Sequence, residues 1–156
     1  MIRKMRRFKQ QLSKEECEGL LKVAPRGVLA VLGDEGYPYA VPLNFVYDDG
    51  SIYFHCAADG HKMDALLACD KASFCVLDEG RQEEGEWWLH FNSVIAFGRV
   101  QRVVEEDAMR DALHKLGRKY FPQGYDLEGD IARNLSRVAI LRLSIEHLTG
   151  KHVREK

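Results

Sequence analysis

Residues 37–56 read YPYAVPLNFVYDDGSIYFHC, and this stretch predicts two antiparallel strands joined by a turn. In its first half, aromatic and aliphatic side chains occupy every second position, which is typical of a strand with one buried face. Residues 48–51 have the composition of a turn, and a second run of β-forming residues follows them. Pro42 lies inside the first strand, where a proline is tolerated at an edge or a bulge. The stretch therefore predicts a hairpin at an irregular edge of an antiparallel sheet.

Four further strands are expected outside the hairpin, because runs of β-forming residues there are bounded by turn residues. They are predicted at residues 27–32, 72–77, 87–104 and 137–148, with a bend near Gly98. Helices are predicted at residues 13–24, about 60–69 and 105–120, with at most a short helix at 131–134. Strictly alternating strand–helix–strand units are absent, which counts against a Rossmann arrangement. We therefore expect an α+β protein built around a six-stranded antiparallel β-barrel with inserted helices.

The composition suits one globular domain over residues 1–156, since 46% of the residues are hydrophobic and 30% are charged. A formal net charge of -1 gives no global field that would attract nucleic acid or a membrane surface. Residues 1–12 carry a basic run without the apolar segment of a signal peptide, which predicts a solvated N-terminal arm. No apolar run approaches the roughly 18 residues that span a bilayer. We expect a cytoplasmic protein with no nucleic-acid or membrane partner.

The four cysteines contain no C-x-x-C pair and predict free thiols in a reducing compartment. A metal site built from His55, Cys56 and His61 has a spacing that matches no common zinc pattern. We therefore expect no metal.

Charges along the helix expected at about 60–69 are the reverse of what a helix dipole favours. His61 and Lys62 stand in its first turn and Asp70 at its far end, although a helix N-terminus favours acids. The reversal becomes favourable if a phosphate or another anion binds the N-terminal amides together with Lys62. The alternative is a solvated lysine that costs a few tenths of a kcal/mol. His55 ends the second hairpin strand, so we expect it at the same rim.

No Ser-His-Asp arrangement, paired-carboxylate signature, Walker loop or H-E-x-x-H motif is readable. Ser93, in an otherwise apolar strand, has a hydroxyl suited either to donating to a phosphate or to accepting from a backbone amide. Without a nucleophile of its own, the chain would depend on a bound cofactor for any reaction.

Five motifs in order resemble the FMN-binding split-barrel superfamily, which is pyridoxamine 5'-phosphate oxidase-like. Within it they are most similar to the nitroimidazole-resistance branch. The motifs are VPLNF at 41–45, YFHCA at 53–57, GHK at 60–62, SVIAFG at 93–98 and TGK at 149–151. Together they extend over nearly the whole chain. The resemblance implies a homodimer of six-stranded split barrels with the flavin at the subunit interface.

The resemblance also implies roles for individual residues. Lys62, helped by Ser93 and the helix N-terminus, would hold the FMN phosphate. Leu43 and Asn44 would contact the isoalloxazine, and His55 would stand beside the ring as the tentative catalytic residue. The remaining expected cofactor contacts are Pro42, Cys56, His61 and, from either subunit, Lys151.

The implied activity is that of a flavin-dependent reductase or oxidase. It would pass electrons from a reduced nicotinamide to a small-molecule acceptor such as a nitro-aromatic compound, with FMN as cofactor or FAD in its place. One alternative is a non-catalytic flavin- or haem-binding protein. Candidate haem ligands are His55, His61, His90 and His147. A pyridoxamine phosphate oxidase ranks lowest, because basic residues for a second phosphate are not identifiable.

Overall fold

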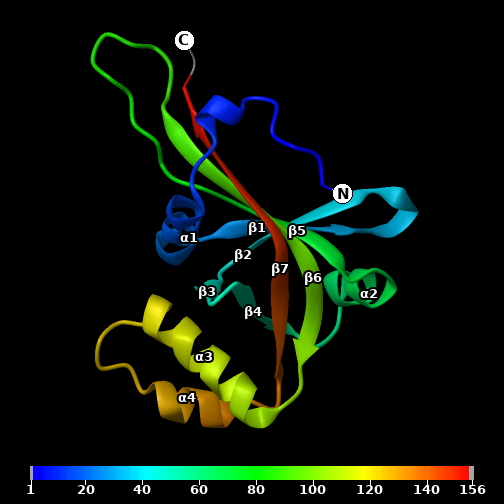
Figure 1. Cartoon of the computed structure of the whole chain (residues 1–156). Helices are drawn as coiled ribbons and strands as arrows, with labels where there is room; N and C mark the ends of the chain where they lie inside the picture. The colour runs from blue at the N-terminus through cyan, green and yellow to red at the C-terminus, as the bar shows by residue number, and fades with distance from the viewer. Residues whose placement is uncertain (1, 155–156) are drawn as a thin grey trace.

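The computed structural model describes residues 2–154 and confirms the α+β class. Its helices are η1 (Phe8–Gln10), α1 (Lys14–Val23), η2 (Asp34–Gly36), α2 (His61–Ala68), α3 (Glu106–Tyr120) and α4 (Leu127–Asn134). Its strands are β1 (Gly27–Leu32), β2 (Pro38–Leu43), β3 (Val46–Asp48), β4 (Ser51–Ala57), β5 (Lys71–Leu77), β6 (Phe91–Val103) and β7 (Val138–Val153). They form one sheet of order β2-β1-β5-β6-β7-β4-β3, in which every neighbouring pair is antiparallel (Figure 1).

The expectation of six strands is wrong, and the barrel is not closed. The run expected as one strand over residues 37–47 forms both β2 and β3, which stand at opposite edges of the sheet. The break falls at Asn44 and Phe45. The Phe45 side chain is buried in the core, and its backbone N–H and C=O both bond the Tyr120 hydroxyl of α3, at 2.9 Å each. Because Tyr120 takes these groups out of strand pairing, the β2 ladder ends at Leu43.

Three other boundaries differ from expectation. β6 begins at Phe91 rather than at 87, and β7 continues to Val153 rather than to 148, because the two strands pair from end to end. α4 begins at Leu127, whereas at most a short helix at 131–134 was expected. The Asp126 side chain caps α4 by accepting a hydrogen bond from the backbone N–H of Gly129 at 2.9 Å.

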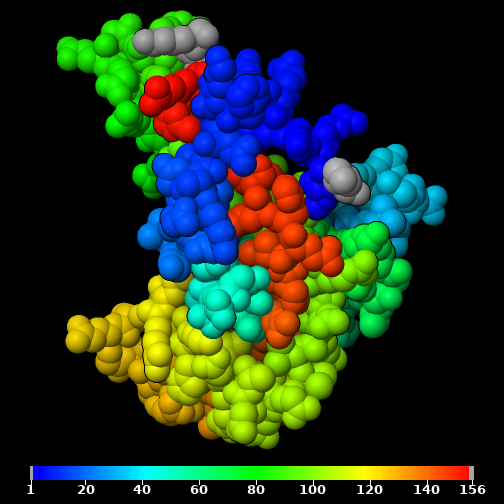
Figure 2. Space-filling model, viewed as in Figure 1, coloured from blue at the N-terminus to red at the C-terminus, as the bar shows by residue number. Residues whose placement is uncertain are grey.

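The β6–β7 pair carries the bend that was expected near Gly98. The register shifts between Phe97 and Gly98, and a Cβ at Gly98 would overlap the backbone of Ser144 on β7, so only glycine permits this approach. Beyond the bulge, the part of the pair that joins Phe91–Phe97 to His147–Val153 extends from the body of the protein, with the loop 78–90 at its tip. Figures 1 and 2 show this arm at the end opposite to α3 and α4.

The inner face of the sheet holds the main core. Fully buried side chains from five strands are Leu29, Phe54, Phe74, Val94 and Leu141. Helix α1 adds Cys17 and Leu21 to this core, and the predicted capping box of Ser13 and Glu16 begins it. All four cysteines are free thiols, as predicted.

The outer face of the sheet is covered unevenly. α3 packs against β3 and β4, and Ile140 of β7 is fully buried although it points outward. At the other half of the sheet, Val28, Leu32 and Leu77 point outward from β1 and β5 and remain exposed. Within residues 2–154, no helix combines the length and the apolar character needed to cross a membrane.

Candidate functional site

The N-terminus of α2 lies beside the end of β4, as the sequence predicted. Gly60 is the N-cap with φ of 105°, a left-handed conformation that favours glycine, and no side chain caps this end. Lys62 is half-buried in the first turn and lies next to Cys56 of β4. Burial raises the pKa of the Cys56 thiol, and the Lys62 ammonium offsets part of that rise. The helix end, the lysine and β4 therefore meet at one rim.

His61 is not turned toward β4, unlike Lys62. Its ring stacks on Tyr39 of β2 with centroids 4.2 Å apart, and its Nε2 lies 3.5 Å from an Asp34 carboxylate oxygen. These contacts hold His61 on the turn between β1 and β2. The expected charge reversal is incomplete, because Asp64 also stands in the first turn of α2 and Asp34 pairs with His61.

His55 and Cys56 point to opposite sides of β4, as strand alternation requires. Cys56 faces inward, with its sulfur 3.9 Å from the Met63 sulfur of α2. His55 faces outward into a hollow that is open on one side. Burial, and secondarily the charge of Lys62, lowers the pKa of His55 below its ordinary value, so its ring is neutral at neutral pH.

His55 and Asn44 line a cavity of about 410 Å³ between β4, α3 and α4. Most of its lining is apolar, with Leu113, Leu116, Phe121, Leu127, Ile131 and Val138. Asp130 and Asn134 of α4 add polar groups to the wall. Sequence reasoning missed these two residues because at most a short helix at 131–134 was expected here, although Asp126 ahead of Leu127 and Ile131 at i, i+4 spacing is a signal for a longer helix.

α3 fixes the position of Asn44 through its neighbour Phe45. The Lys119 ammonium donates to the carbonyls of Ala24 and Phe45, at 2.8 and 2.9 Å, and lies 3.9 Å from the centre of the Phe45 ring. Burial lowers the pKa of Lys119 to about 8. The Tyr120 hydroxyl also bonds the Pro25 carbonyl at 2.7 Å. The last turn of α3 therefore holds the break between β2 and β3 in one conformation.

The remaining expected site residues do not join this rim within one chain. Ser93 and Lys151 are direct partners in the β6–β7 ladder, whereas His55 pairs with Ile140. Ile140 and Lys151 are eleven positions apart on one strand, a separation of roughly 35 Å along it. Pro42 is exposed on the outer face of β2, and Leu43 points to the inner face. The set thus falls into separate groups on a single subunit.

A larger hollow of about 710 Å³ lies at the N-terminal arm, between Gln10, Glu16 and His152. It contains none of the residues expected to bind the cofactor. We place the candidate site at the smaller cavity, which is more apolar and is lined by His55, the residue next to Lys62 at the rim.

A family model described as pyridoxamine 5'-phosphate oxidase matches residues 13–152, which is most of the chain. The chain belongs to this family. Its membership confirms the resemblance drawn from the five motifs. No curated protein matches the chain in sequence.

Solved structures similar to this family member share its fold at low sequence identity. One is described as a candidate 5-nitroimidazole antibiotic resistance protein of Bacteroides thetaiotaomicron; it is 20% identical with a TM-score of 0.77, over 91% of this chain and 86% of that one. An FAD-binding protein of Mesorhizobium loti is 24% identical with a TM-score of 0.69, over 93% and 98%. An FAD- and haem-binding protein of Mycobacterium smegmatis is 21% identical with a TM-score of 0.75, over 94% and 74%.

Proposed function

We propose that this family member binds a flavin, FMN first and FAD as the alternative, and transfers electrons from a reduced nicotinamide to a small-molecule acceptor such as a nitro-aromatic compound. The observation that carries the proposal is the meeting of Lys62, the uncapped N-terminus of α2 and His55 at one rim, beside an apolar cavity. Family membership supports it, as does the fold shared with proteins that are described as FAD-binding.

The rim has the chemistry that a flavin phosphate requires. None of the ion pairs within residues 2–154 involves Lys62, whereas the neighbouring His61 pairs with Asp34. A phosphate carries about two negative charges, which suit a lysine and exposed helix amides together. We assign phosphate binding to Lys62 and the first turn of α2, and only a secondary role to His61.

His55 and Asn44 are suited to the flavin ring. A neutral His55 offers a hydrogen bond without placing a positive charge beside the ring, and no hydrogen bond between residues of the described chain occupies the Asn44 carboxamide. When bound, the flavin supplies the hydride and electron transfer. The residues of the chain hold it, orient it and exclude water from one side.

We further propose that two copies pair through the exposed outer face of β1, β2 and β5. Val28, Leu32 and Leu77 would be covered there, and Pro42 lies opposite Val28 in the same ladder. Ser93 on β6 and its ladder partner Lys151 on β7 are too far along the sheet to reach the flavin of their own chain. In the proposed dimer, they would contribute to the partner's site.

Titration of the purified protein with FMN and with FAD, followed by flavin fluorescence and by anaerobic mixing with NADH or NADPH, tests the proposal. We expect saturable flavin uptake and bleaching of the flavin band on reduction. A protein that takes up neither flavin contradicts the proposal. Uptake of haemin with a Soret band, and no uptake of flavin, would instead favour the haem-binding alternative.

A further inference from the structure

We infer that the cavity between β4, α3 and α4 is a substrate site that selects largely apolar molecules carrying an N–H or cationic nitrogen, and rejects anions. Its volume of about 410 Å³ lies in the range of small-molecule sites. The identification of its ligand as the electron acceptor rests on the proposed flavin function. The selection by charge rests on the cavity alone.

The polar residues that line the cavity come from two different parts of the chain. Asn44 and His55 belong both to the lining and to the proposed flavin site. Asp130 and Asn134 come to the lining from α4. Most of the remaining lining side chains are apolar. A bound molecule would therefore have one end near the flavin and its polar group against α4.

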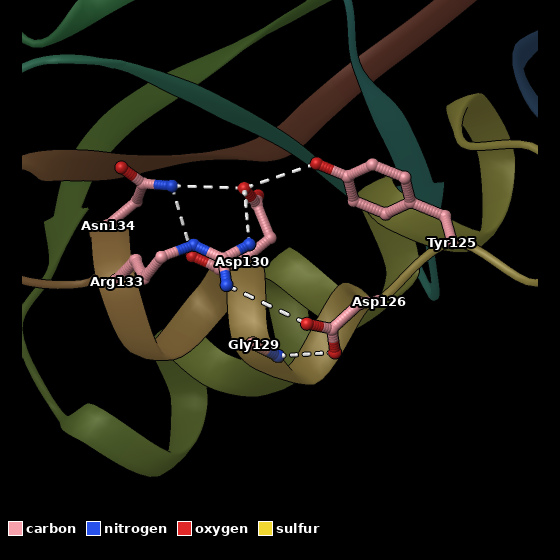
Figure 3. A network of polar contacts seen from close by, with 6 residues as sticks. All are labelled: Tyr125, Asp126, Gly129, Asp130, Arg133 and Asn134. Carbon is pink, nitrogen blue, oxygen red and sulfur yellow. Dashed lines mark hydrogen bonds and ion pairs between the residues drawn. The ribbon is translucent and has the colours of Figure 1, made fainter.

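The Asp130 carboxylate is oriented by its neighbours and keeps one oxygen available. Its Oδ1 accepts from Asn134 Nδ2 at 3.1 Å and from the Tyr125 hydroxyl at 3.3 Å, and Arg133 lies 3.8 Å from the same atom (Figure 3). Arg133 also lies 3.6 Å from Asp126, so its charge is shared. Within residues 2–154, no hydrogen bond or ion pair involves Oδ2. Asp130 is thus an anchored acceptor with an unused oxygen.

No lysine or arginine belongs to the lining of the cavity within the described chain. Lys119, the nearest in sequence to the lining residue Tyr120, donates to the carbonyls of Ala24 and Phe45 instead. An anion entering the cavity would lose hydration, find no lysine or arginine in the lining and meet the Asp130 carboxylate, whose charge Arg133 offsets only in part at 3.8 Å. A cation or an N–H donor would gain a charge-assisted hydrogen bond there. The cavity is therefore unsuited to a phosphorylated substrate.

The depth of the cavity is set by the close packing of α3 on α4. Gly117 of α3 lies against Leu127, and a Cβ at this glycine would overlap the Leu127 side chain. The glycine lets α4 approach closely, so the α4 side chains reach the cavity without filling it. Leu113, on the same helix, is a position where a larger side chain would occupy the space.

The test uses 2-naphthamidine and 2-naphthoate, which match in shape and differ in the sign of their charge. Isothermal titration of the full chain, without flavin and with saturating FMN, measures the affinity for each. We expect the amidine to bind at least about tenfold more tightly than the carboxylate. Asp130→Asn should abolish most of that preference, and Leu113→Trp should weaken the binding of both. Glu128→Gln removes one charge from the exposed side of α4 and should retain the preference.

Several results would overturn the inference. They are equal or tighter binding of 2-naphthoate, a preference that Asp130→Asn leaves unchanged, or binding that Leu113→Trp does not affect in a variant whose circular dichroism is native. If FMN fails to bind while the amidine preference holds, the flavin proposal fails and the charge selection stands. With FMN bound, the amidine should shift the flavin spectrum. An unshifted spectrum would overturn the assignment of the cavity as the acceptor site.

Discussion

At the scale of single residues, Lys62 stands where the helix dipole disfavours a cation by a few tenths of a kcal/mol, and Asp64 in the same turn offsets part of that cost. Its charge lies in the first turn of α2, where the helix dipole repels a cation. A residue that is unfavourable in the free protein and favourable in the complex is typical of a binding site. The reversed charges were readable in the sequence because a helix turn is local. The contacts of His61 with Tyr39 and Asp34 could not be predicted from the sequence, because they depend on the fold.

We expect Lys62→Ala to weaken FMN binding by about 1–3 kcal/mol, the range for a lost charge-assisted contact. This corresponds to roughly a five- to 150-fold higher Kd by fluorescence titration. The thermal midpoint of the flavin-free protein should stay the same or rise slightly. Lys22→Ala, at an exposed lysine of α1, is the matched control and should leave the Kd unchanged. An unaltered Kd in Lys62→Ala would place the phosphate elsewhere.

Lys119 makes stability depend on pH at alkaline values. Its pKa falls to about 8 in the folded chain from an ordinary value near 10.5. Between these values the unfolded chain binds more protons, so this group makes the free energy of unfolding rise with pH. In urea titrations near pH 7 and near pH 10, wild type should gain stability relative to Lys119→Met at the higher pH. A difference between the two proteins that does not change with pH would contradict the burial of this charge.

At the scale of elements, the sequence predicts what is local and misses what depends on distant contacts. The capping box of α1, the turn into β4 and the bend at Gly98 are each specified by adjacent residues, and each is observed. The alternation of apolar residues continues through Asn44 and Phe45, so nothing local marks the break. Its cause is Tyr120, 75 residues away. The cavity was missed for the same reason, since α3 and α4 reach β4 only in the fold.

Removal of the Tyr120 hydroxyl should loosen the break between β2 and β3. Tyr120→Phe leaves the N–H and C=O of Phe45 and the carbonyl of Pro25 with fewer partners. We expect a loss of about 1–3 kcal/mol in the free energy of unfolding. FMN affinity should also fall, because Asn44 is no longer held in place.

Tyr37→Phe removes a hydroxyl from a tyrosine that is 75% exposed. It should change stability by less than about 0.5 kcal/mol. Equal effects of the two variants would show that the Tyr120 contacts do not position the break.

At the scale of the whole molecule, the outer face of β1 and β5 carries the exposed aliphatic side chains on which the proposed dimer rests. Val28, Leu32 and Leu77 form part of one continuous sheet face, and Ser93 with Lys151 continues it away from the rim. Composition and charge could not predict where this face lies. The separation of Ser93 and Lys151 from Lys62 becomes understandable if the site is shared between two copies.

We expect the protein to sediment with about twice the subunit mass of 17.9 kDa. Val28→Glu would place a carboxylate in the middle of the paired face, at a cost of several kcal/mol. The variant should sediment as a monomer and bind FMN more weakly. Val104→Glu, at another exposed valine, should remain dimeric. A wild-type monomer that binds FMN normally would refute the shared site.

The two edges of the sheet come from segments that are neighbours in the chain, so the sheet resembles a ring cut at one point. Asn44 and Phe45 connect the two edges, and α3 holds this connection through hydrogen bonds to the Phe45 backbone. A ligand that binds Asn44 would therefore also stabilise the connection between the two edge strands β2 and β3. Amide hydrogen exchange in β2 and β3 should slow on FMN binding far more than in β6, which is paired on both sides. If amide exchange slowed equally in all strands, this local stabilisation of β2 and β3 would be contradicted.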